Sequence, residues 1–351
     1  MRSTQQQWLR SADRAMDKQS LAMLARGTVA PARQSWWLPI SIVVLLAAML
    51  LGAYIGPAGR ISSANWNLVW TVRMPRVVLA GLVGAMLSIS GASYQGAFRN
   101  PLADPYLLGV ASGSGLGATI VFVVGRANTS GWLIDPLPLA SFAGGLLAVL
   151  FTYIVGAAFG SQRSSITLVL AGVAITSLLT AIQTFVLYQN NDVIREVYSW
   201  ILGRLNTATW SDVRLVAPYI GISSIVLLLH RRHLDVLRVG DDEAASLGMQ
   251  VTRVRLIVVV AATLGTAAAV SVSGLIGFVG IVVPHAVRML AGASYRRLLP
   301  LTIVLGATFL ILTDIPGRVL NHGAETPIGV VTAFFGAPFF IVVLMNRRLA
   351  E

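Results

Sequence analysis

Residues 256–287, which decide the fold, read LIVVVAATLGTAAAVSVSGLIGFVGIVVPHAV. This uncharged stretch of 32 residues is longer than the roughly 20 apolar residues that a helix needs to span a bilayer. Its centre, Ser271-Val-Ser-Gly274-Leu-Ile-Gly277, is rich in small residues that favour a turn. The stretch is therefore either one overlong helix or two helices joined by a tight turn.

Eight further uncharged stretches divide the chain. They are residues 34–59, 77–98, 105–125, 136–162, 164–191, 215–230, 298–313 and 326–346. The two stretches of 16 residues, 215–230 and 298–313, must take in flanking residues to cross a bilayer. Only 11% of the residues are charged and 56% are hydrophobic, whereas about 25% are charged in average soluble domains. This composition excludes a disordered chain and predicts an all-α, polytopic membrane protein.

The distribution of basic residues selects the number of spans. The net charge is +12, and 25 of the 26 bases are arginine. If residues 256–287 form two helices, 18 bases lie on the side of both termini and 8 on the other side, whereas nine spans give 14 and 12. Because bases collect in cytoplasmic loops, we expect ten transmembrane helices with both termini in the cytoplasm. Bases scattered between apolar stretches in this way do not indicate a nucleic-acid-binding surface.

The first 35 residues differ from the rest of the chain. They are polar, carry six bases and end at Trp36-Trp37. A signal peptide would have its apolar stretch sooner. We expect residues 1–35 to be a basic cytoplasmic tail and residues 36–351 to be a single transmembrane domain.

The predicted spans lack the groups that catalysis or ion coupling requires. Ion-coupled carriers keep Asp, Glu or His inside their helices, and Asp104 and Asp314 lie at the edges of stretches, where loop positions are expected. The only lysine, Lys18, is not in a P-loop, so the chain is not an ATPase. With no cysteine, we expect no thiolate metal site, and His285 alone fits a structural hydrogen bond better than a haem ligand. We therefore expect no catalytic or metal-binding residue.

The loop at residues 231–253 contains an unusual acidic segment, GDDEAASLGM at residues 240–249. Three consecutive acids favour the N-terminus of a helix, and a glycine favours its end. We expect a short helix whose residues include Asp241, Asp242, Glu243, Ala244, Ala245 and Leu247, ending at Gly248. Such a helix suits docking into a groove of a soluble partner, and a solvated loop is the alternative.

Several segments together resemble the permease subunits of type II ABC importers, which take up iron–siderophore complexes, haem and vitamin B12. The similar segments are QGAFRNPLADPYLLG at residues 95–109, the acidic segment at 240–248, GFVGIVVPHAVR at 277–288, RLLP at 297–300 and ETPIGVVTAFFGAPF at 325–339. The resemblance extends from about Arg73 to the C-terminus and does not include the basic tail.

This resemblance implies a fold and a set of partners. It implies ten helices in each permease and an assembly of two permeases with two ATP-binding cassette subunits, which bind ATP and Mg; the permease itself holds no cofactor. A homodimer is expected, and a pair of different permeases stays open. It further implies an extracytoplasmic substrate-binding protein and a place in the cytoplasmic (inner) membrane of a bacterium or archaeon, with the lipid bilayer around the helices.

The resemblance also implies roles for particular residues. The segment from Asp241 to Gly248 would couple the permease to the ATPase. Arginines that dock the substrate-binding protein correspond to Arg73, Arg76 and Arg318. Residues of the cytoplasmic gate correspond to Asn100, Pro101, Leu102, Ser164 and Ser165.

The substrate is the least determined property. We expect an iron chelate, either a siderophore or haem, because most of the family serves iron, and cobalamin is the alternative within the family. A secondary metabolite carrier is the alternative of another class, but it predicts midplane charges and inverted repeats that are not apparent here. An intramembrane enzyme would need clustered catalytic side chains.

Overall fold

The computed structural model describes residues 36–56, 66–125, 135–158, 165–319 and 325–345. The chain divides into two units, residues 1–39 and 40–351. In the first unit only residues 36–39 are described, and they include the start of helix α2. The predicted basic tail lies outside the described residues, so the account below concerns the second unit.

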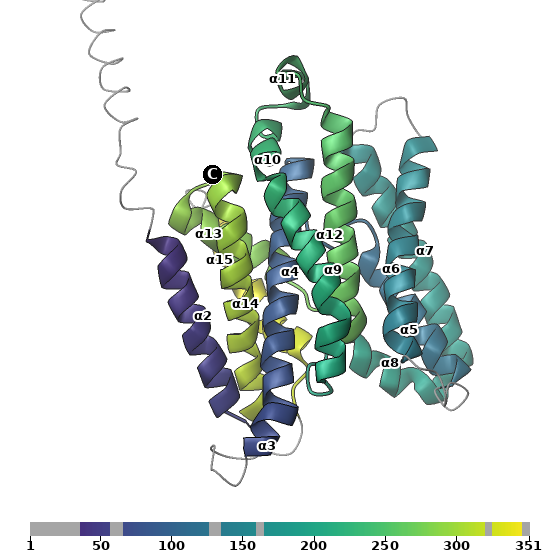
Figure 1. Cartoon of the computed structure of the whole chain (residues 1–351). Helices are drawn as coiled ribbons and strands as arrows, with labels where there is room; N and C mark the ends of the chain where they lie inside the picture. Colours follow the sequence, from purple (N-terminus) through teal and green to yellow (C-terminus); the bar gives the residue numbers. More distant parts are fainter. Residues whose placement is uncertain (1–35, 57–65, 126–134, 159–164, 320–324, 346–351) are drawn as a thin grey trace, which may run out of the picture. The chain divides into compact units, whose positions relative to one another are not determined.

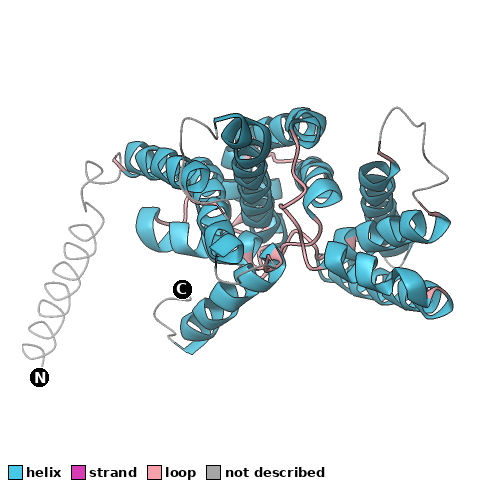
Figure 2. Ribbon diagram, turned by 90° about the horizontal axis from the view of Figure 1, so that it is seen from below, coloured by secondary structure: helices cyan, strands magenta, loops and turns pink. Residues whose placement is uncertain are grey.

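Among the described residues, seven helices are long and apolar enough to cross a membrane and three shorter helices are also apolar. Figure 1 shows how they are arranged. The seven long helices are α2 (Trp37–Tyr54), α4 (Met74–Phe98), α6 (Pro136–Ala158), α7 (Ser165–Gln189), α9 (Trp210–Leu229), α12 (Val251–Ser273) and α14 (Tyr295–Val319). The three shorter helices are α5 (Val110–Val124), α13 (Val279–Ala291) and α15 (Ile328–Met345). Helix is the only regular secondary structure among the described residues (Figure 2). The structure confirms the predicted all-α membrane fold of about ten helices.

Short helices lie between the spans. They are α3 (Trp66–Leu68), which continues into α4 through a π-helical turn at Val69–Arg73, a 3₁₀ turn at Asn191–Val193, α8 (Ile194–Ile201), α10 (Arg231–Leu237) and α11 (Asp241–Ser246). Figure 1 shows α3 and α11 at opposite ends of the bundle. We refer to these as the α3 end and the α11 end.

The stretch at residues 256–287 divides into two helices, as the arginine distribution predicted. Helix α12 ends at Ser273 and α13 begins at Val279. Gly274 ends α12 with φ at 69°, and a Cβ on this residue would lie 2.1 Å from the Trp200 carbonyl oxygen. Both the left-handed backbone and the close contact require glycine here.

Helix α4 is the centre of the bundle and is buried along almost its whole length. It packs against α9, α12, α13 and α14. Added Cβ atoms at Gly84 and Gly91 would lie 2.3 and 2.0 Å from the carbonyl oxygens of Gly306 and Gly280. Because apolar surface gives no driving force between helices in lipid, such close backbone contact supplies the packing energy.

Candidate functional site

The acidic segment at the α11 end folds into the predicted short helix. Gly240, with φ at 135°, precedes α11, and Gly248, with φ at 84°, follows it. The Gly248 N–H donates to the Ala245 carbonyl at 2.9 Å, and the Met249 N–H donates to the Ala244 carbonyl at 3.1 Å. These two bonds form a Schellman motif, which satisfies the last carbonyls of the helix.

The side chains of this segment divide into an inner and an outer set. Ala244 is fully buried. The exposed set is Asp242, Glu243, Ala245, Ser246, Leu247 and Gly248. Leu247 is 72% exposed at the end of a helix that carries two exposed carboxylates. An accessible apolar side chain on a capped, charged helix is suited to contact with a protein partner.

Asp241 is the exception among the three acids, because it bonds to its own chain. Arg255 Nη2 donates to both Asp241 carboxylate oxygens at 2.9 Å, and Arg255 Nε donates to the Ala97 carbonyl at 2.9 Å. Arg99 lies 3.6 Å from the same carboxylate. Asp241 therefore ties the start of α11 to the end of α4 and to α12.

Asp235, on the neighbouring short helix α10, connects that helix to the start of α14. Its carboxylate accepts hydrogen bonds from the Tyr295 N–H at 2.7 Å, the Ser294 hydroxyl at 2.9 Å and the Arg296 N–H at 3.3 Å. A carboxylate at these N–H groups caps the start of the helix. Asp235 was not among the predicted site residues, although an acid among the bases of residues 230–238 was a possible signal.

The proposed gate residues that can be described lie in the loop after α4. Arg99 ends α4 in the left-handed conformation, with φ at 50°, and the Asn100 N–H donates to the Gln95 carbonyl at 3.1 Å. Asn100 Oδ1 accepts the Leu102 N–H at 2.9 Å, and Asn100, Pro101 and Leu102 are exposed. Ser164 lies outside the described residues and Ser165 is the first residue of α7. The grouping of all five residues as a gate stays a prediction.

The end of α4 and the loop after it are fastened to α13 and to the connection before it. Gln95 Nε2, on α4, donates to the Gly280 carbonyl of α13 at 3.1 Å and to the Ala103 carbonyl of the loop at 3.3 Å. The Tyr106 hydroxyl both donates to the Ile276 carbonyl and accepts the Ile276 N–H, each at 3.1 Å. The bond between Gln95 and Gly280 joins the first and third segments of the sequence resemblance. Neither Gln95 nor Tyr106 was among the predicted site residues.

Asp104 lies in this loop, as predicted, and its carboxylate accepts the Tyr106 N–H at 2.8 Å. Burial raises the pKa of the Asp104 carboxyl to about 6, and the hydrogen bond from the Tyr106 N–H opposes the shift. The carboxyl group is close to its titration range at neutral pH.

The α3 end contains a buried cluster of ion pairs. Arg76 donates to Asp314 through Nε at 2.9 Å and Nη2 at 2.8 Å, and to Glu325 through Nη1 at 2.8 Å. Arg318 Nε donates to Asp314 Oδ2 at 2.7 Å. The loop position expected for Asp314 was wrong. It lies within α14, because Arg76 and Arg318 neutralise its charge there.

All three arginines predicted to dock a substrate-binding protein lie at the α3 end. Arg73, Arg76 and Arg318 are 5%, 8% and 4% exposed. Arg73 donates to the Tyr54 carbonyl at 2.9 Å and so caps the end of α2, and Arg318 also donates to the Gly52 carbonyl at 2.8 Å. Since these guanidinium groups bond within the chain, a docking role requires them to exchange partners, and that role stays a prediction.

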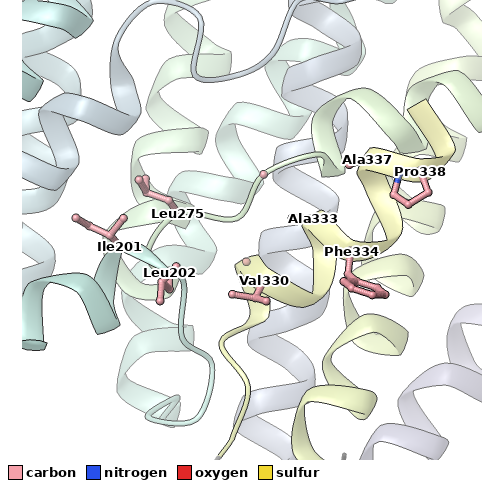
Figure 3. Close-up of a pocket in the computed structure, with 10 residues that line it drawn as sticks. Ile201, Leu202, Leu275, Val330, Ala333, Phe334, Ala337 and Pro338 are labelled. Carbon is pink, nitrogen blue, oxygen red and sulfur yellow. The ribbon is translucent and has the colours of Figure 1, made fainter. Parts of the chain in front are cut away.

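An apolar hollow of about 620 Å³ opens beside α15 (Figure 3). Its lining includes Ile201 and Leu202 at the end of α8, Leu275 in the connection between α12 and α13, and Val330 and Phe334 on α15. The Gly329 N–H donates to the Leu202 carbonyl at 2.9 Å, which holds the start of α15 against the end of α8. The hollow has no charged lining among the described residues. No group of three or more His, Asp or Glu side chains in the described ranges could hold a metal ion.

Comparison with known proteins agrees with this arrangement. Residues 33–346 match the FecCD transport family. The chain belongs to this family. Its members are permeases of type II ABC importers for vitamin B12, haem and siderophores, and this chain is the permease of an ABC importer. It is a multi-pass membrane protein of an ABC transporter complex and is not itself an ATPase.

Three relatives illustrate the range of this family. The cobalamin import system permease protein BtuC of Halobacterium salinarum is 40% identical over 282 residues, or 80% of this chain and 74% of that protein. The hemin transport system permease protein HmuU of Yersinia pestis is 36% identical over 302 residues, or 82% of this chain and 86% of that protein. The iron(3+)-hydroxamate import system permease protein FhuB of Bacillus subtilis is 35% identical over 287 residues, or 82% and 73%.

A solved structure shares the fold of this FecCD permease. It is described as a metal-chelate type ABC transporter in an inward-facing conformation. The two are 30% identical with a TM-score of 0.78, over 88% of this chain and 98% of that one.

Proposed function

We propose that this FecCD permease carries an iron chelate, a siderophore complex or haem, across the cytoplasmic membrane of a bacterium or archaeon. The observation that carries the proposal is the family match over residues 33–346, with relatives named for hemin and for iron(3+)-hydroxamate. At the α3 end, Asp314 forms ion pairs with Arg76 and Arg318. Its carboxylate is therefore not free to bind a coupling ion. Energy for transport then comes from a partner ATPase.

The α11 end is the proposed ATPase contact and faces the cytoplasm, with both termini on that side. Asp242, Glu243, Ala245, Leu247 and Gly248 would contact the ATP-binding cassette subunit, which supplies ATP and Mg. Asp241 and Ala244 would instead hold α11 to the permease, because both are engaged within the chain. A displacement of α11 by the ATPase would be transmitted to α4 and α12 through the bonds around Asp241, and to α14 through Asp235 on α10. Such a linkage suits rigid-body movement of helices between two states.

The proposed substrate path lies between two copies of the chain. Helices α7 and α15 carry no charged residue and expose large side chains, including Leu170, Phe185 and Phe334. A wide path with weak, uncharged contacts would release a bulky chelate at each step. The substrate-binding protein would deliver the chelate at the α3 end, with Arg73, Arg76 and Arg318 as its docking residues.

Cobalamin is the second candidate substrate. It is favoured by the 40% identity to a cobalamin import permease. Both candidates are large metal chelates, so the composition of the path fits either one.

The test is transport by the reconstituted complex. The permease, its ATPase and its substrate-binding protein are placed in proteoliposomes, and ATP-dependent uptake of hemin, a ferric hydroxamate and cobalamin is compared. We expect uptake of an iron chelate, abolished when the binding protein is omitted. Uptake of cobalamin alone would identify cobalamin as the substrate in place of an iron chelate. Uptake of all three compounds without ATP would contradict the importer mechanism.

A further inference from the structure

A small hollow at the α11 end is lined by three arginines. It has a volume of about 230 Å³, and its lining consists of Gln95, Gly96, Arg99, Pro101, Arg238, Arg288 and Tyr295. These residues come from the end of α4 and the loop after it, the end of α10, the end of α13 and the start of α14. Among the described residues the lining contains no carboxylate. The hollow therefore concentrates positive charge where four elements meet.

One nitrogen of the Arg288 guanidinium group in this hollow has no hydrogen-bond acceptor. Its Nη2 donates to Gln95 Oε1, which fixes the guanidinium group. Its Nη1 is buried and makes no hydrogen bond to any described residue. Arg288 also interacts favourably with Tyr295, through charge and a hydrogen bond, and is repelled less strongly by Arg238. A buried N–H without an acceptor is costly, and an anion that accepts a hydrogen bond from Arg288 Nη1 would remove this cost.

The nearest acids are already engaged elsewhere. Asp241 lies 3.6 Å from Arg99 but receives both of its short hydrogen bonds from Arg255. Asp235 accepts the Tyr295 N–H, the Ser294 hydroxyl and the Arg296 N–H. Asp241 thus pairs with Arg99, whereas among the described residues neither acid forms a salt bridge with Arg238 or Arg288.

We infer that this hollow binds a phosphate group. Guanidinium groups match phosphate oxygens in a bidentate geometry, and a phosphate presents several oxygens to the three arginines and the Tyr295 hydroxyl. Two sources share this chemistry, the headgroup of an anionic phospholipid and a free phosphate in solution. Basic pockets between helices near the membrane surface are suited to anionic headgroups. The inference does not depend on which chelate the permease carries.

A second arginine hollow lies nearby and serves as an internal comparison. It has a volume of about 500 Å³ and is lined by Arg231, Ser294, Arg296 and Arg297. Arg296 and Arg297 are exposed, and none of the four has a buried side-chain N or O atom without a hydrogen-bond partner. Solvent can satisfy these groups, as it can Arg99 and Arg238, so the two hollows differ in the buried Nη1 of Arg288.

The first experiment measures binding of inorganic phosphate. The full-length permease is purified in detergent without phosphate, and phosphate is titrated by calorimetry against chloride at equal ionic strength. Arg238→Gln and Arg99→Gln should each weaken phosphate binding by about tenfold, since a hydrogen bond between charged groups contributes at least 1.4 kcal/mol or so. The matched control is Arg232→Gln, an exposed arginine on the same helix α10 that does not line the hollow, and it should leave binding unchanged.

The second experiment separates the two sources. The same proteins are placed in nanodiscs of phosphatidylcholine with or without phosphatidylglycerol, and native mass spectrometry counts the retained phosphatidylglycerol. Retention by the wild type that Arg238→Gln reduces identifies a lipid headgroup, whereas phosphate binding without retention identifies a free phosphate. The inference is overturned if neither ligand binds the wild type better than Arg238→Gln, or if Arg232→Gln lowers binding equally.

Discussion

Acidic residues at the two ends of the bundle have opposite surroundings. At the α3 end, Asp314 is buried between Arg76 and Arg318, and Glu325 completes a cluster in which two positive and two negative charges balance. At the α11 end, Asp242 and Glu243 are exposed and make no ion pair with described residues, while Asp235 and Asp241 fasten the short helices to the bundle.

This difference separates charges that hold the fold from charges that are available to a partner. Removing one member of a buried ion pair leaves its partner charged in a medium that solvates it poorly. An exposed charge is solvated by water whether or not a partner is present, so its removal has little effect on folding. Both kinds of charge are carried by Asp and Glu, so residue type does not distinguish them, whereas the burial of the carboxylate does.

The largest effect is expected from Asp314→Asn at the α3 end. This change leaves Arg76 and Arg318 without their shared carboxylate, at a cost of about 3–5 kcal/mol. Thermal unfolding and size-exclusion profiles in detergent should show loss of the folded permease. Glu325→Gln should cost less because the Glu325 side chain is 28% exposed, and the exposed Asp192→Asn serves as the control with no effect. A stable Asp314→Asn protein would contradict a structural role for the cluster.

The next effect is expected from Leu247→Asp at the α11 end. The permease should fold normally, but binding to the ATPase subunit should weaken by at least about thirtyfold, the usual loss for a central contact residue. Pull-down affinity and ATPase stimulation measure this loss. Tyr198→Asp, an exposed residue of α8 at the other end of the bundle, is the control and should bind normally. Equal binding by Leu247→Asp would exclude this side chain from the ATPase contact.

A smaller effect is expected from Gly248→Ala, which isolates backbone conformation. No atom lies within 4 Å of a Cβ at Gly248 or at Gly221, but only Gly248 has a positive φ, of 84°. Alanine at residue 248 should therefore cost about 1–2 kcal/mol at the end of α11. Gly221→Ala should be neutral or slightly stabilising. Hydrogen exchange of the amides at residues 244–249 measures the difference, and equal exchange in both variants would refute the requirement for glycine.

The smallest effect is expected for the pH dependence due to Asp104. Its pKa is about 6 in the folded protein and about 4 in an unfolded chain. Folding therefore takes up a proton, and this contribution to stability is present at low pH and is lost as the pH rises through about 6. Lowering the pH from 7.5 to 5.5 should stabilise the wild type by less than about 1 kcal/mol more than Asp104→Asn. Identical pH profiles of melting temperature would show that Asp104 does not titrate in this range.

The sequence predicted the features that depend on composition and local pattern. Ten spans followed from the arginine distribution. The start of α11 followed from three acids, and its predicted end at Leu247 is one residue beyond the observed end at Ser246. Contacts between distant segments were not predictable in the same way. Asp314 was placed in a loop because its partner Arg76 is 238 positions away. Asp235 and Tyr106 were missed because their partners, near residues 295 and 276, are brought close only by the packing around α4.

The Tyr106 hydroxyl satisfies both the N–H and the C=O of Ile276, in the unwound connection between α12 and α13. Ile276 is buried, and buried backbone outside a helix persists only where the protein itself supplies partners for its polar groups. A single oxygen atom supplies both here. The connection therefore cannot straighten, lengthen or slide past the loop at residues 99–109 without leaving the N–H and C=O of the buried Ile276 unpaired. During the transport cycle, α13 and that loop should travel as one mechanical part, with the flexible points outside their junction.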